Sequence, residues 1–545
     1  MNKRWKIKSQ PKAGRPLADI IKILLQNRNL KTKKEIAQFL DPPLPKTPGD
    51  IKKSELQKAV FRIKKAIKNK EPIIVYGDYD ADGICATAVL WEALHSLGAK
   101  ALPFIPDRIK HGYGLSKKGI DELLNNETMK QWNNESIKLI ITVDNGIVAH
   151  KAIEYAKSKG IEVIVTDHHQ KKDDLPKAEA IVWSDKIAGV GVAWVLTQAL
   201  AESKKNLDLV AIGTVADMMP LLGLNRSFVK YGLEQLNKTN RVGLQALFEE
   251  AGLRKGQIST WQIGYLIAPR LNAMGRLEQA LDSLRLLCTR NKKRASDLSK
   301  VLGLTNKERQ ELTLSTFENA KSKSKVKIQK SKIIFIAEES YNQGVIGLVA
   351  GRLVEAFYRP AIVVSKGEIY SKASVRSVKG FNIIEFLRKF EDLLEDLGGH
   401  PMAAGFTVKT KNLTELSKRL EEMAVEEISD ELLQPVLEAD MELDFCDINR
   451  HLFSQLRKFE PFGIGNPQPS FVSHNAELVS FRQVGAQRKH LKLCLQDFDA
   501  IAFNHGHLAT ELKVGQKVDI LYTIEEDTWN GNNKLQLKIR DIKKS

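Results

Sequence analysis

Apolar residues form short β-branched runs separated by helical patterns between residue 72 and about residue 217. The runs IIVY (73–76), IKLIITV (137–143) and IEVIVT (161–166) predict strands, and the segments between them predict helices. Fully apolar strands joined by helices are typical of a parallel sheet that is covered on both faces. The pattern therefore predicts an α/β domain in this part of the chain.

The C-terminal half has a second strand–helix alternation and a strand-rich end. The alternation starts at KIIFIAEE (332–339), and NIIEFLRKFEDLLEDL (382–397) within it predicts one helix with Gly398 at its C-cap. From about residue 435 the pattern is strand-rich, with a turn signal at NGNN (530–533), which predicts a small antiparallel barrel.

Two further segments are strongly charged and helical in pattern. Residues 1–70 are basic and mostly helical, and 277–325 predict a long connecting helix with one break near Gly303. The expected organisation has five segments: an N-terminal extension at 1–70, an α/β domain at 71–275, a linker helix at 276–327, a smaller α/β domain at 328–432 and an all-β domain at 433–545.

Net charge favours a polyanionic partner. Lys and Arg number 84 against 66 Asp and Glu, which gives +18 and suggests nucleic acid. The four cysteines include no CxxC pair, so a zinc site or disulfide framework is not expected, and a reducing cytoplasm fits. The start, MNKRWKIKSQPKAG, lacks the apolar core of a signal peptide. No apolar run approaches the roughly 20 residues of a membrane span, so we expect a cytoplasmic protein without a membrane partner.

Three aspartates stand at alternate positions directly after the first strand, in PIIVYGDYDADGICA (72–86). The spacing of Asp78, Asp80 and Asp82 before Gly83 resembles an EF-hand loop. However, position 12 of such a loop must be a bidentate Glu and here it is Val89, and a strand precedes the loop instead of a helix. The EF-hand interpretation is therefore not supported.

The other predicted strands also end in ionisable side chains. Each residue alone has a structural explanation, as a turn, a helix end or a strand-end histidine, but their conjunction in one alternating unit indicates a shared site. Neighbouring carboxylates raise each other's pKa, and divalent cations remove that conflict. Carboxylate with imidazole suits Mn²⁺ or Mg²⁺, and two such ions about 3.5–4 Å apart form a common site for phosphate-ester hydrolysis. The candidates are Asp78, Asp80, Asp82, Asp144, Asp167, His168, His169 and Asp217.

These motifs resemble those of the DHH phosphoesterase superfamily. The resemblance rests on GDYDADG (77–83), VDNG (143–146), TDHH (166–169) and the aspartate of TVADMMPL, Asp217. Further stretches are similar to the RecJ family of single-strand-specific 5′→3′ DNA exonucleases: APRLNAMGR (268–276), SVRSVKGFN (374–382), the DHHA1-like GGHPMAAGF (398–406) and FEPFGIGNPQP (459–469) in an OB-fold-like segment.

The resemblance implies a two-ion site for Mn²⁺ or Mg²⁺. Asp80 and Asp144 would hold one ion, and Asp144 would bridge to the second ion, whose ligands are completed by Asp82, His168 and Asp217. Asp78 would orient a ligand or a water, and His169 would face the scissile phosphate. Some relatives carry a histidine ligand where this chain has Tyr76. The resemblance therefore implies that the first ion is bound more weakly or has more water ligands in this chain.

Basic and polar residues of the same motifs are candidates for nucleic-acid contacts. Arg376, with Ser374 and Ser377 beside it, fits a clamp on a terminal phosphate, because arginine binds phosphate oxygens in pairs. Arg108 and Tyr113 could hold a phosphate and stack a base. A surface ion pair is the structural explanation for any single arginine. The remaining candidates are Arg270, Asn272, Arg276, Gly399 and His400.

The resemblance implies a monomeric DHH, DHHA1 and OB-fold enzyme of DNA recombination and repair that releases 5′-mononucleotides from single-stranded DNA. Single-strand-binding protein and a RecQ-type helicase are the partners that it implies. One alternative is a nanoRNase or cyclic-dinucleotide phosphodiesterase of the same superfamily, although these are shorter chains. A second alternative is a non-catalytic nucleic-acid-binding scaffold. The presence of an acidic residue at every expected ligand position argues against it.

Overall fold

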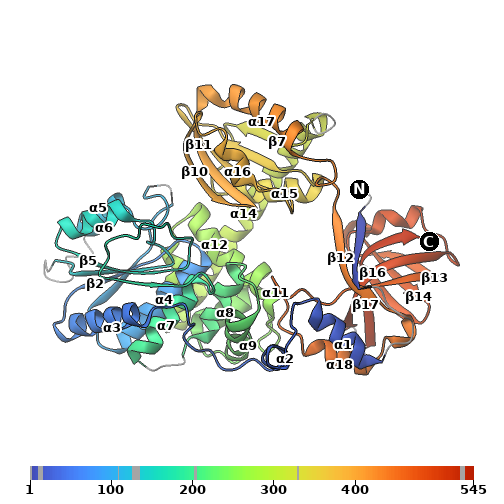
Figure 1. Ribbon diagram of the computed structural model, residues 1–545, viewed down its shortest axis with the longest axis horizontal. Coiled ribbons are helices and arrows are strands. Elements are labelled where there is room, and N and C mark those ends of the chain that lie inside the picture. Colours follow the sequence, from blue (N-terminus) through green and yellow to red (C-terminus); the bar gives the residue numbers. More distant parts are fainter. Residues whose placement is uncertain are drawn as a thin grey trace. The chain divides into compact units, whose positions relative to one another are not determined.

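The computed structural model describes residues 3–9, 16–108, 110–125, 136–201, 205–327, 331–527 and 534–545 (Figure 1). The turn expected at NGNN (530–533) lies outside the described residues. The chain divides into two compact units. The larger holds Trp5–Ala268 together with Leu437–Ser545, and the smaller consists mainly of Pro269–Val436.

A parallel sheet forms the first half of the larger unit. Its strand order is β3-β2-β4-β5-β6, and all neighbouring pairs are parallel. Every residue of β2 and β4 is buried, as expected where helices cover both faces. The predicted parallel α/β domain is therefore confirmed. The strands are β2 (Ile73–Tyr76), β3 (Ala101–Phe104), β4 (Leu139–Val143), β5 (Glu162–Asp167) and β6 (Ala180–Trp183).

Helices lie on both faces of this sheet (Figure 1). Alternate residues such as Ile74 and Tyr76 pack with Ile120 and Ile153 of α5 and α6 in one apolar cluster, while α4 and α7 contact the sheet from the other face. The helices of this half are α3 (Lys53–Lys68), α4 (Ala81–Ser96), α5 (Lys117–Asn125), α6 (His150–Ser158), α7 (Gly189–Ala201), α8 (Leu207–Ala216), α9 (Gly223–Asn237), α10 (Val242–Glu250), α11 (Thr260–Gln262) and a π-helical turn, η2 (Ile263–Ile267).

The other half of the larger unit is a closed β-barrel. β13 pairs with both β14 and β16, and β17 joins β16 to β15, so the ring of strands closes. Most pairs are antiparallel as predicted, but β15 and β17 are parallel. β1 and β12 extend the sheet beyond the ring. The bounds are β1 (Arg4–Ser9), β12 (Val436–Glu442), α18 (Arg450–Arg457), β13 (Phe471–Val484), β14 (His490–Leu495), β15 (Phe498–Ala502), β16 (Lys517–Asp527) and β17 (Lys534–Lys544), with short 3₁₀ turns η4 (Phe445–Asp447), η5 (Ala486–Arg488) and η6 (Gly506–Thr510).

Two N-terminal helices complete the core of the barrel. Helix α1 (Leu17–Gln26) buries Ile20 and Leu24, and α2 (Lys33–Leu40) buries Phe39, in the same cluster as Leu452 and Phe459. Helix α2 begins with a capping box, in which the Thr32 side chain and Glu35 satisfy each other's backbone N–H groups. The N-terminal segment is therefore part of the C-terminal core.

Arg226, on α9, joins the two halves of the larger unit. Its buried guanidinium donates to the carbonyls of Phe39, at 2.7 Å, and Glu460, at 2.6 Å, and also to those of Lys458, Phe459 and Pro461. Its Cζ lies 4.0 Å from the centre of the Phe39 ring. Four of these carbonyls belong to the loop that follows α18, so the arginine satisfies backbone acceptors of this loop.

The smaller unit contains a mixed sheet of order β10-β11-β9-β8-β7, in which only the β7–β8 pair is parallel. Its strands are β7 (Ile334–Glu338), β8 (Ala361–Ser365), β9 (Tyr370–Arg376), β10 (Leu394–His400) and β11 (Ala403–Lys409). Its helices are α12 (Ala268–Leu277), α13 (Leu281–Cys288), α14 (Lys292–Lys327), α15 (Ile346–Phe357), α16 (Ile383–Arg388) and α17 (Leu413–Glu427), with a 3₁₀ turn η3 (Thr410–Asn412).

The predicted break at Gly303 is wrong, because α14 runs unbroken through that residue. One glycine inside a helix costs about 1 kcal/mol relative to alanine, and packing of α14 on α13 and α15 outweighs that cost. The helical stretch is instead interrupted earlier, between α12 and α13 and between α13 and α14. Among the described residues, no helix combines the length and apolar character that a membrane crossing requires.

The helix predicted over 382–397 is also wrong in its second half. Helix α16 ends at Arg388, and Leu394–His400 form strand β10. Gly398 therefore pairs with Gly405 across a hairpin and does not cap a helix. Backbone pairing with β11 overrides a local pattern that favours a helix.

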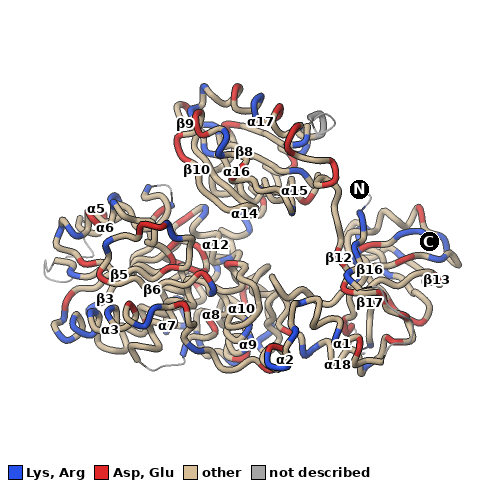
Figure 2. Tube along the Cα trace, viewed as in Figure 1, with Lys and Arg blue, Asp and Glu red and all other residues tan. Residues whose placement is uncertain are grey.

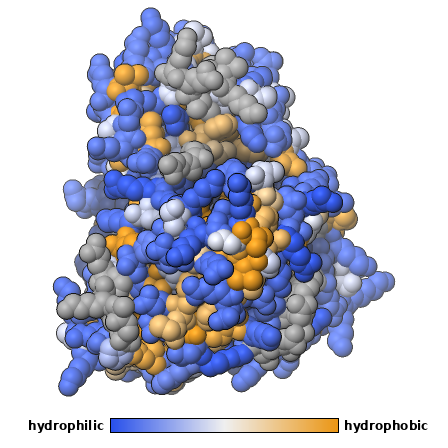
Figure 3. Space-filling view, turned by 90° about the vertical axis from the view of Figure 1, so that its right-hand side faces the viewer, coloured by the Kyte–Doolittle hydropathy of each residue, from blue (hydrophilic) through white to orange (hydrophobic). Residues whose placement is uncertain are grey.

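Charged residues of both signs are spread over both units, and several lysines lie along α3 (Figure 2). Hydrophilic residues cover most of the face in Figure 3, and hydrophobic residues form small patches between them. Such isolated patches are normal for a folded protein. Several large apolar side chains of the larger unit are nevertheless more than half exposed, among them Phe61, Trp261 and Tyr265.

We predict that Arg226→Met lowers the free energy of unfolding of the larger unit by about 3 kcal/mol or more, because several buried carbonyls lose their donor at roughly 1–3 kcal/mol each. Chemical denaturation monitored by circular dichroism measures this change. Lys230→Ala is the matched control, since Lys230 lies on the same helix and contacts the exposed Asp41 and the neighbouring Tyr231 ring but no buried carbonyl among the contacts described. Equal unfolding midpoints for the two variants would contradict the role of Arg226.

Candidate active site

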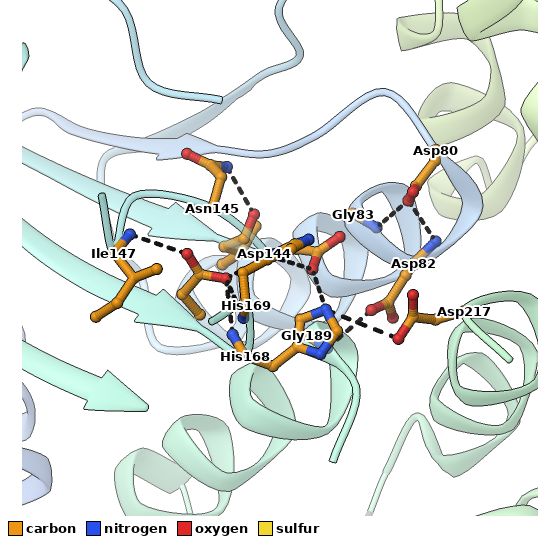
Figure 4. Close-up of polar contacts among 12 residues, drawn as sticks. Asp80, Asp82, Gly83, Asp144, Asn145, Ile147, His168, His169, Gly189 and Asp217 are labelled. Carbon is orange, nitrogen blue, oxygen red and sulfur yellow. Dashed lines mark hydrogen bonds and ion pairs between the residues drawn. The ribbon is translucent and has the colours of Figure 1, made fainter. Parts of the chain in front are cut away.

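Ionisable side chains gather at the carboxyl edge of the parallel sheet (Figure 4). Strands β2, β4 and β5 are neighbours, so the loops that follow them lie side by side. These loops carry Asp80, Asp144 and His168, and the end of α8 brings Asp217 to the same place. The structure thus brings together candidates that the sequence spreads over about a quarter of its length.

The side chains form three overlapping groups whose ligand atoms lie within 4.8 Å of one another. Asp144 and His168 each belong to two groups, and His168 Nε2 is 3.2 Å from Asp144 Oδ1 and 3.7 Å from Asp217 Oδ2. This overlap allows one carboxylate to serve two neighbouring cations. The groups are Asp78, Asp80 and Asp144; Asp82, His168 and Asp217; and Asp144, His168 and His169.

The start of α4 fixes two of these aspartates. Asp80 is the N-cap of the helix, and its Oδ1 accepts hydrogen bonds from the backbone N–H groups of Asp82 and Gly83, both at 3.0 Å. The Asp82 carboxylate crosses to the start of α7, where it accepts from the N–H groups of Gly189 at 2.8 Å and Val190 at 3.1 Å. Both side chains are therefore held by backbone donors without a neighbouring cation.

Two glycines leave room for the carboxylates. A Cβ atom at Gly189 would lie 2.3 Å from Asp144 Oδ1, and one at Gly213 would lie 2.4 Å from Asp82 Oδ1. Any larger residue would displace a carboxylate. The sequence analysis did not identify these glycines, because both lie within helices where no turn signal marks them.

Asn145 connects the loops at this sheet edge through hydrogen bonds of its side chain. Its Nδ2 donates to the carbonyls of Val143 at 2.9 Å and Gly77 at 3.1 Å, and its Oδ1 accepts from Leu115 N–H at 3.1 Å. The adjacent Asp144 has a left-handed backbone with φ 63°, a conformation that persists in a non-glycine residue only where surrounding contacts fix it. From the sequence, Asp144 was a candidate ligand, whereas Asn145 was not given a role.

Burial and mutual repulsion make the carboxylate cluster unfavourable when it is fully ionised. Burial raises the pKa of Asp78, Asp82 and Asp144 well above the usual range, and neighbouring aspartates raise it further. Burial and repulsion from Asp80 raise the pKa of Asp217 to about 7. The Oδ1 atoms of Asp78 and Asp144 are buried and accept no hydrogen bond among the described residues. Unsatisfied carboxylate oxygens within such close groups fit divalent cations with oxygen and imidazole ligands.

His169 has a different environment. Asp167 Oδ1 accepts from His169 Nδ1 at 2.8 Å, and the carboxylate also accepts backbone N–H bonds from Ile147, His168 and His169. Burial alone would lower the pKa of His169, but the Asp167 contact and nearby carboxylates raise it to about 9. Burial would likewise raise the pKa of Asp167, but these hydrogen bonds hold it below the usual value. Asp167 therefore orients a protonated imidazole and belongs to none of the three ligand groups.

Aromatic side chains line the rim beside His169. The Tyr113 hydroxyl lies 2.8 Å from His169 Nε2, and its ring meets the Tyr79 ring edge-on. The Arg108 guanidinium lies 5.6 Å from the centre of the Tyr79 ring. Arg108 and Tyr113 are thus placed near the cluster, and Tyr79 joins them. Its position between two ligand aspartates could have singled it out.

The smaller unit holds the other basic candidates. Arg276, on α12 with Arg270 and Asn272, donates to the Gly344 carbonyl at 3.0 Å. On β9, Arg376 Nη1 lies 3.4 Å from Ser374 Oγ and donates to the Val375 carbonyl at 2.8 Å.

Other predicted contacts of this unit have structural partners or lie in a turn. The Ser377 hydroxyl is buried and donates to the Phe381 carbonyl at 2.8 Å. Gly399 and His400 end strand β10 at an exposed hairpin. A Cβ atom at Gly399 would lie 2.4 Å from the Ala403 carbonyl oxygen, so the hairpin itself requires glycine there.

Three family models match the chain in order. They are the DHH family N-terminal domain at residues 72–214, the DHHA1 domain at 324–426 and the RecJ OB domain at 439–541. The matched ranges cover the parallel sheet, the mixed sheet and the barrel.

Curated proteins named single-stranded-DNA-specific exonuclease RecJ are similar over nearly the whole chain. The Bacillus subtilis protein is 37% identical over 93% of this chain, which spans 64% of that relative's length. The Thermus thermophilus protein is 33% identical, with 93% of this chain and 73% of the relative covered. The Escherichia coli protein is 31% identical, with 96% of each covered.

Solved structures give the same picture. RecJ from Thermus thermophilus in complex with Mn²⁺ matches 99% of this chain and 80% of its own, with a TM-score of 0.83 and 31% identity. The Mg²⁺ complex from the same organism has a TM-score of 0.76 and 29% identity, with 99% and 78% covered. On sequence identity over most of both chains, and on fold, the chain belongs to the RecJ family.

Proposed function

We propose that this chain is a metal-dependent exonuclease that hydrolyses single-stranded DNA in the 5′→3′ direction and releases 5′-mononucleotides. The observation that carries the proposal is the set of overlapping ligand groups that share Asp144 and His168 at one sheet edge. The names of the related RecJ proteins support the choice of substrate. The net charge of +18 suits a polyanionic strand.

The bound ions would be two Mn²⁺ or Mg²⁺; RecJ from Thermus thermophilus has been solved in complex with each of these metals. Asp80 and Asp144 would hold one ion, with Asp78 beside it. Asp144 would also bind the second ion, whose ligands are completed by Asp82, His168 and Asp217. When bound, such a pair supplies Lewis-acid stabilisation of charge on the phosphoryl oxygens. The residues fit this pair because Asp78 and Asp144 each have a buried, unsatisfied oxygen and belong with Asp80 to one close group of ligand atoms.

The chain's own groups would position the phosphodiester. The contact with Asp167 raises the pKa of His169, which favours the protonated imidazole that would donate a hydrogen bond to a phosphate oxygen. Asp167 fixes the imidazole through Nδ1, so Nε2 is the atom that faces the substrate. The Tyr113 hydroxyl lies 2.8 Å from His169 Nε2. The phosphate would either displace this hydroxyl from Nε2 or accept a hydrogen bond from it as well.

Further contacts would hold the strand. Arg108, with Tyr79 and Tyr113, would bind a phosphate and stack a base. Arg376 with Ser374 would bind a terminal phosphate, because both present donors on the same face of β9. The remaining predicted contacts are Arg270, Asn272, Arg276, Ser377, Gly399 and His400.

We assign these proposed functions to the segments expected from the sequence. Residues 71–275 would be the DHH catalytic domain, 276–327 the linker helix and 328–432 the DHHA1 substrate-binding domain. Residues 433–545 would form the OB-fold domain that binds nucleic acid, and 1–70 the N-terminal extension. The matched family models support this arrangement.

The alternatives are less favoured. A nanoRNase or cyclic-dinucleotide phosphodiesterase would not account for the match to the RecJ OB domain. A scaffold would not need a complete set of ligand carboxylates. We further propose a monomer that works in the cytoplasm with single-strand-binding protein and a RecQ-type helicase.

Digestion of end-labelled single strands tests the function. With Mn²⁺ present, a 5′ label should leave early as a mononucleotide, while a 3′ label should stay on a long product. A duplex of the same sequence should persist. Early release of the 3′ label, or equal digestion of the duplex, would contradict the proposal.

We predict that Asp144→Asn abolishes cleavage and leaves the fold intact, because the variant loses the shared ligand while removing one repelling charge. Without metal, its melting temperature should equal or exceed that of the native chain. Mn²⁺ should raise the melting temperature of the native chain, since it binds the folded state, and should raise that of the variant much less. An unchanged metal-induced shift in differential scanning fluorimetry would contradict the shared-ligand assignment.

We also predict that Arg376→Ala weakens action on a 5′-phosphorylated strand by roughly ten- to a hundredfold in kcat/KM. A hydrogen bond to a charged group contributes about 1.5–3 kcal/mol. The loss should be much smaller on a 5′-hydroxyl strand. Arg419→Ala is the matched control, because Arg419 lies in the same unit and pairs with exposed Asp392. If Arg376→Ala slowed both strands equally, the terminal-phosphate role would be wrong.

A further inference from the structure

Two aromatic rings stand exposed on the larger unit, in a segment that the proposed site residues do not include. Trp261, on α11, and Tyr265, on the π-helical turn η2, are 55% and 67% exposed. Their ring centres are 5.4 Å apart and the ring planes are inclined by 24°, so the rings stack. A stacked and largely exposed pair differs from the isolated apolar side chains that surfaces normally carry.

The backbone that carries these rings is well fixed. Ser259 and Gln262 form a capping box at the start of α11, and the Thr260 hydroxyl donates to the Phe462 carbonyl at 2.7 Å. Ile263 and Ile267, on the other side of η2, are fully buried. The two exposed rings therefore stand on a fixed backbone, which limits the entropy that would be lost when a flat ligand stacks on them.

This segment is continuous with the proposed metal centre. Gly264 lies between Ile263 and Tyr265, and a Cβ atom there would be 4.0 Å from Val215, two residues before Asp217. On the side towards the barrel, the Leu221 N–H donates to the Ile464 carbonyl at 2.7 Å. Residues 217–221, 260–265 and 462–464 thus form one connected surface of the larger unit.

Charge along the same segment favours a polyanion. Within the larger unit, residues 251–268 contain two basic residues, Arg254 and Lys255, and no aspartate or glutamate. Arg254 and Lys255 lie in the turn that leads to α11, where Lys255 is exposed. Flat aromatic faces beside basic side chains are the combination that binds single-stranded nucleic acid without sequence preference, since every base has a π-face.

We propose that Trp261 and Tyr265 form a stacking platform for bases of a single-stranded DNA substrate. The inference rests on the proposed exonuclease function. Because such an enzyme removes the 5′ terminal nucleotide, the platform would hold bases on the 3′ side of the scissile bond. It would therefore contribute to the binding of long strands and would be idle with a dinucleotide.

Kinetics on strands of two lengths test the platform. For Trp261→Ala and Tyr265→Ala, KM for a long oligothymidylate should rise roughly 5- to 150-fold, the range for loss of one stacked base, with kcat nearly unchanged. KM for the 5′-phosphorylated dinucleotide should not change. Trp261→Phe should retain most of the affinity, and Phe61→Ala, which removes a comparably exposed ring from α3, should have no effect. Equal KM values for native and platform variants on the long strand would overturn the proposal.

Two further measurements separate base stacking from other roles. Stacking should quench tryptophan fluorescence when oligothymidylate is titrated with Ca²⁺ as a probe ion, and Trp261→Phe should remove that part of the quenching. An oligomer with abasic sugars should bind the native chain and the platform variants equally. If the abasic oligomer lost as much affinity as oligothymidylate in the variants, the rings would contact the backbone or stabilise the fold, and the stacking proposal would be wrong. If the native chain cut no strand, the proposed exonuclease function would be wrong. The fluorescence titration would still show whether Trp261 and Tyr265 stack on DNA bases.

Discussion

Mutual repulsion between buried carboxylates is the constraint on which the rest of the larger unit depends. Asp78, Asp82 and Asp144 are almost completely buried at one sheet edge, and none has a lysine or arginine as an ion-pair partner among the described contacts. Such an arrangement is stable only if the surrounding backbone holds it or if cations neutralise it. The backbone contribution is visible in the donors at the start of α4 and α7 and in the glycines that make space for the oxygens.

Within this one site the environment gives aspartates opposite properties. The carboxylates that face one another have a raised pKa, whereas Asp167, at the end of a neighbouring strand, has a lowered pKa because backbone N–H donors and an imidazolium surround it. The first kind suits metal coordination, and the second kind suits the orientation of an imidazole. Aspartate therefore has two different roles in this site, and the partners that the fold places around each carboxylate decide which role it has.

The alternation of strands and helices could be predicted from the sequence, because strands buried on both faces are apolar throughout. The candidate ligand residues that the structure brings together could be named from the sequence because each follows such a strand or ends a helix. The role of Asp167 could not be inferred, since its partners include an N–H group twenty residues away in the chain. Gly189 and Gly213 were missed because their importance depends on carboxylates from other elements. Strand β10 was missed because its pairing with β11 outweighs a local helical pattern.

The barrel core has a consequence for how the protein can be made. Ile20, Leu24 and Phe39 belong to the first tenth of the chain, but they pack against residues such as Leu452 and Leu478 from the last fifth. A nascent chain on the ribosome therefore exposes these apolar helix faces until the barrel strands have been synthesised. During that interval they need a chaperone or transient burial elsewhere to avoid association with other chains. A premature stop codon anywhere before the barrel would leave the same surface permanently uncovered.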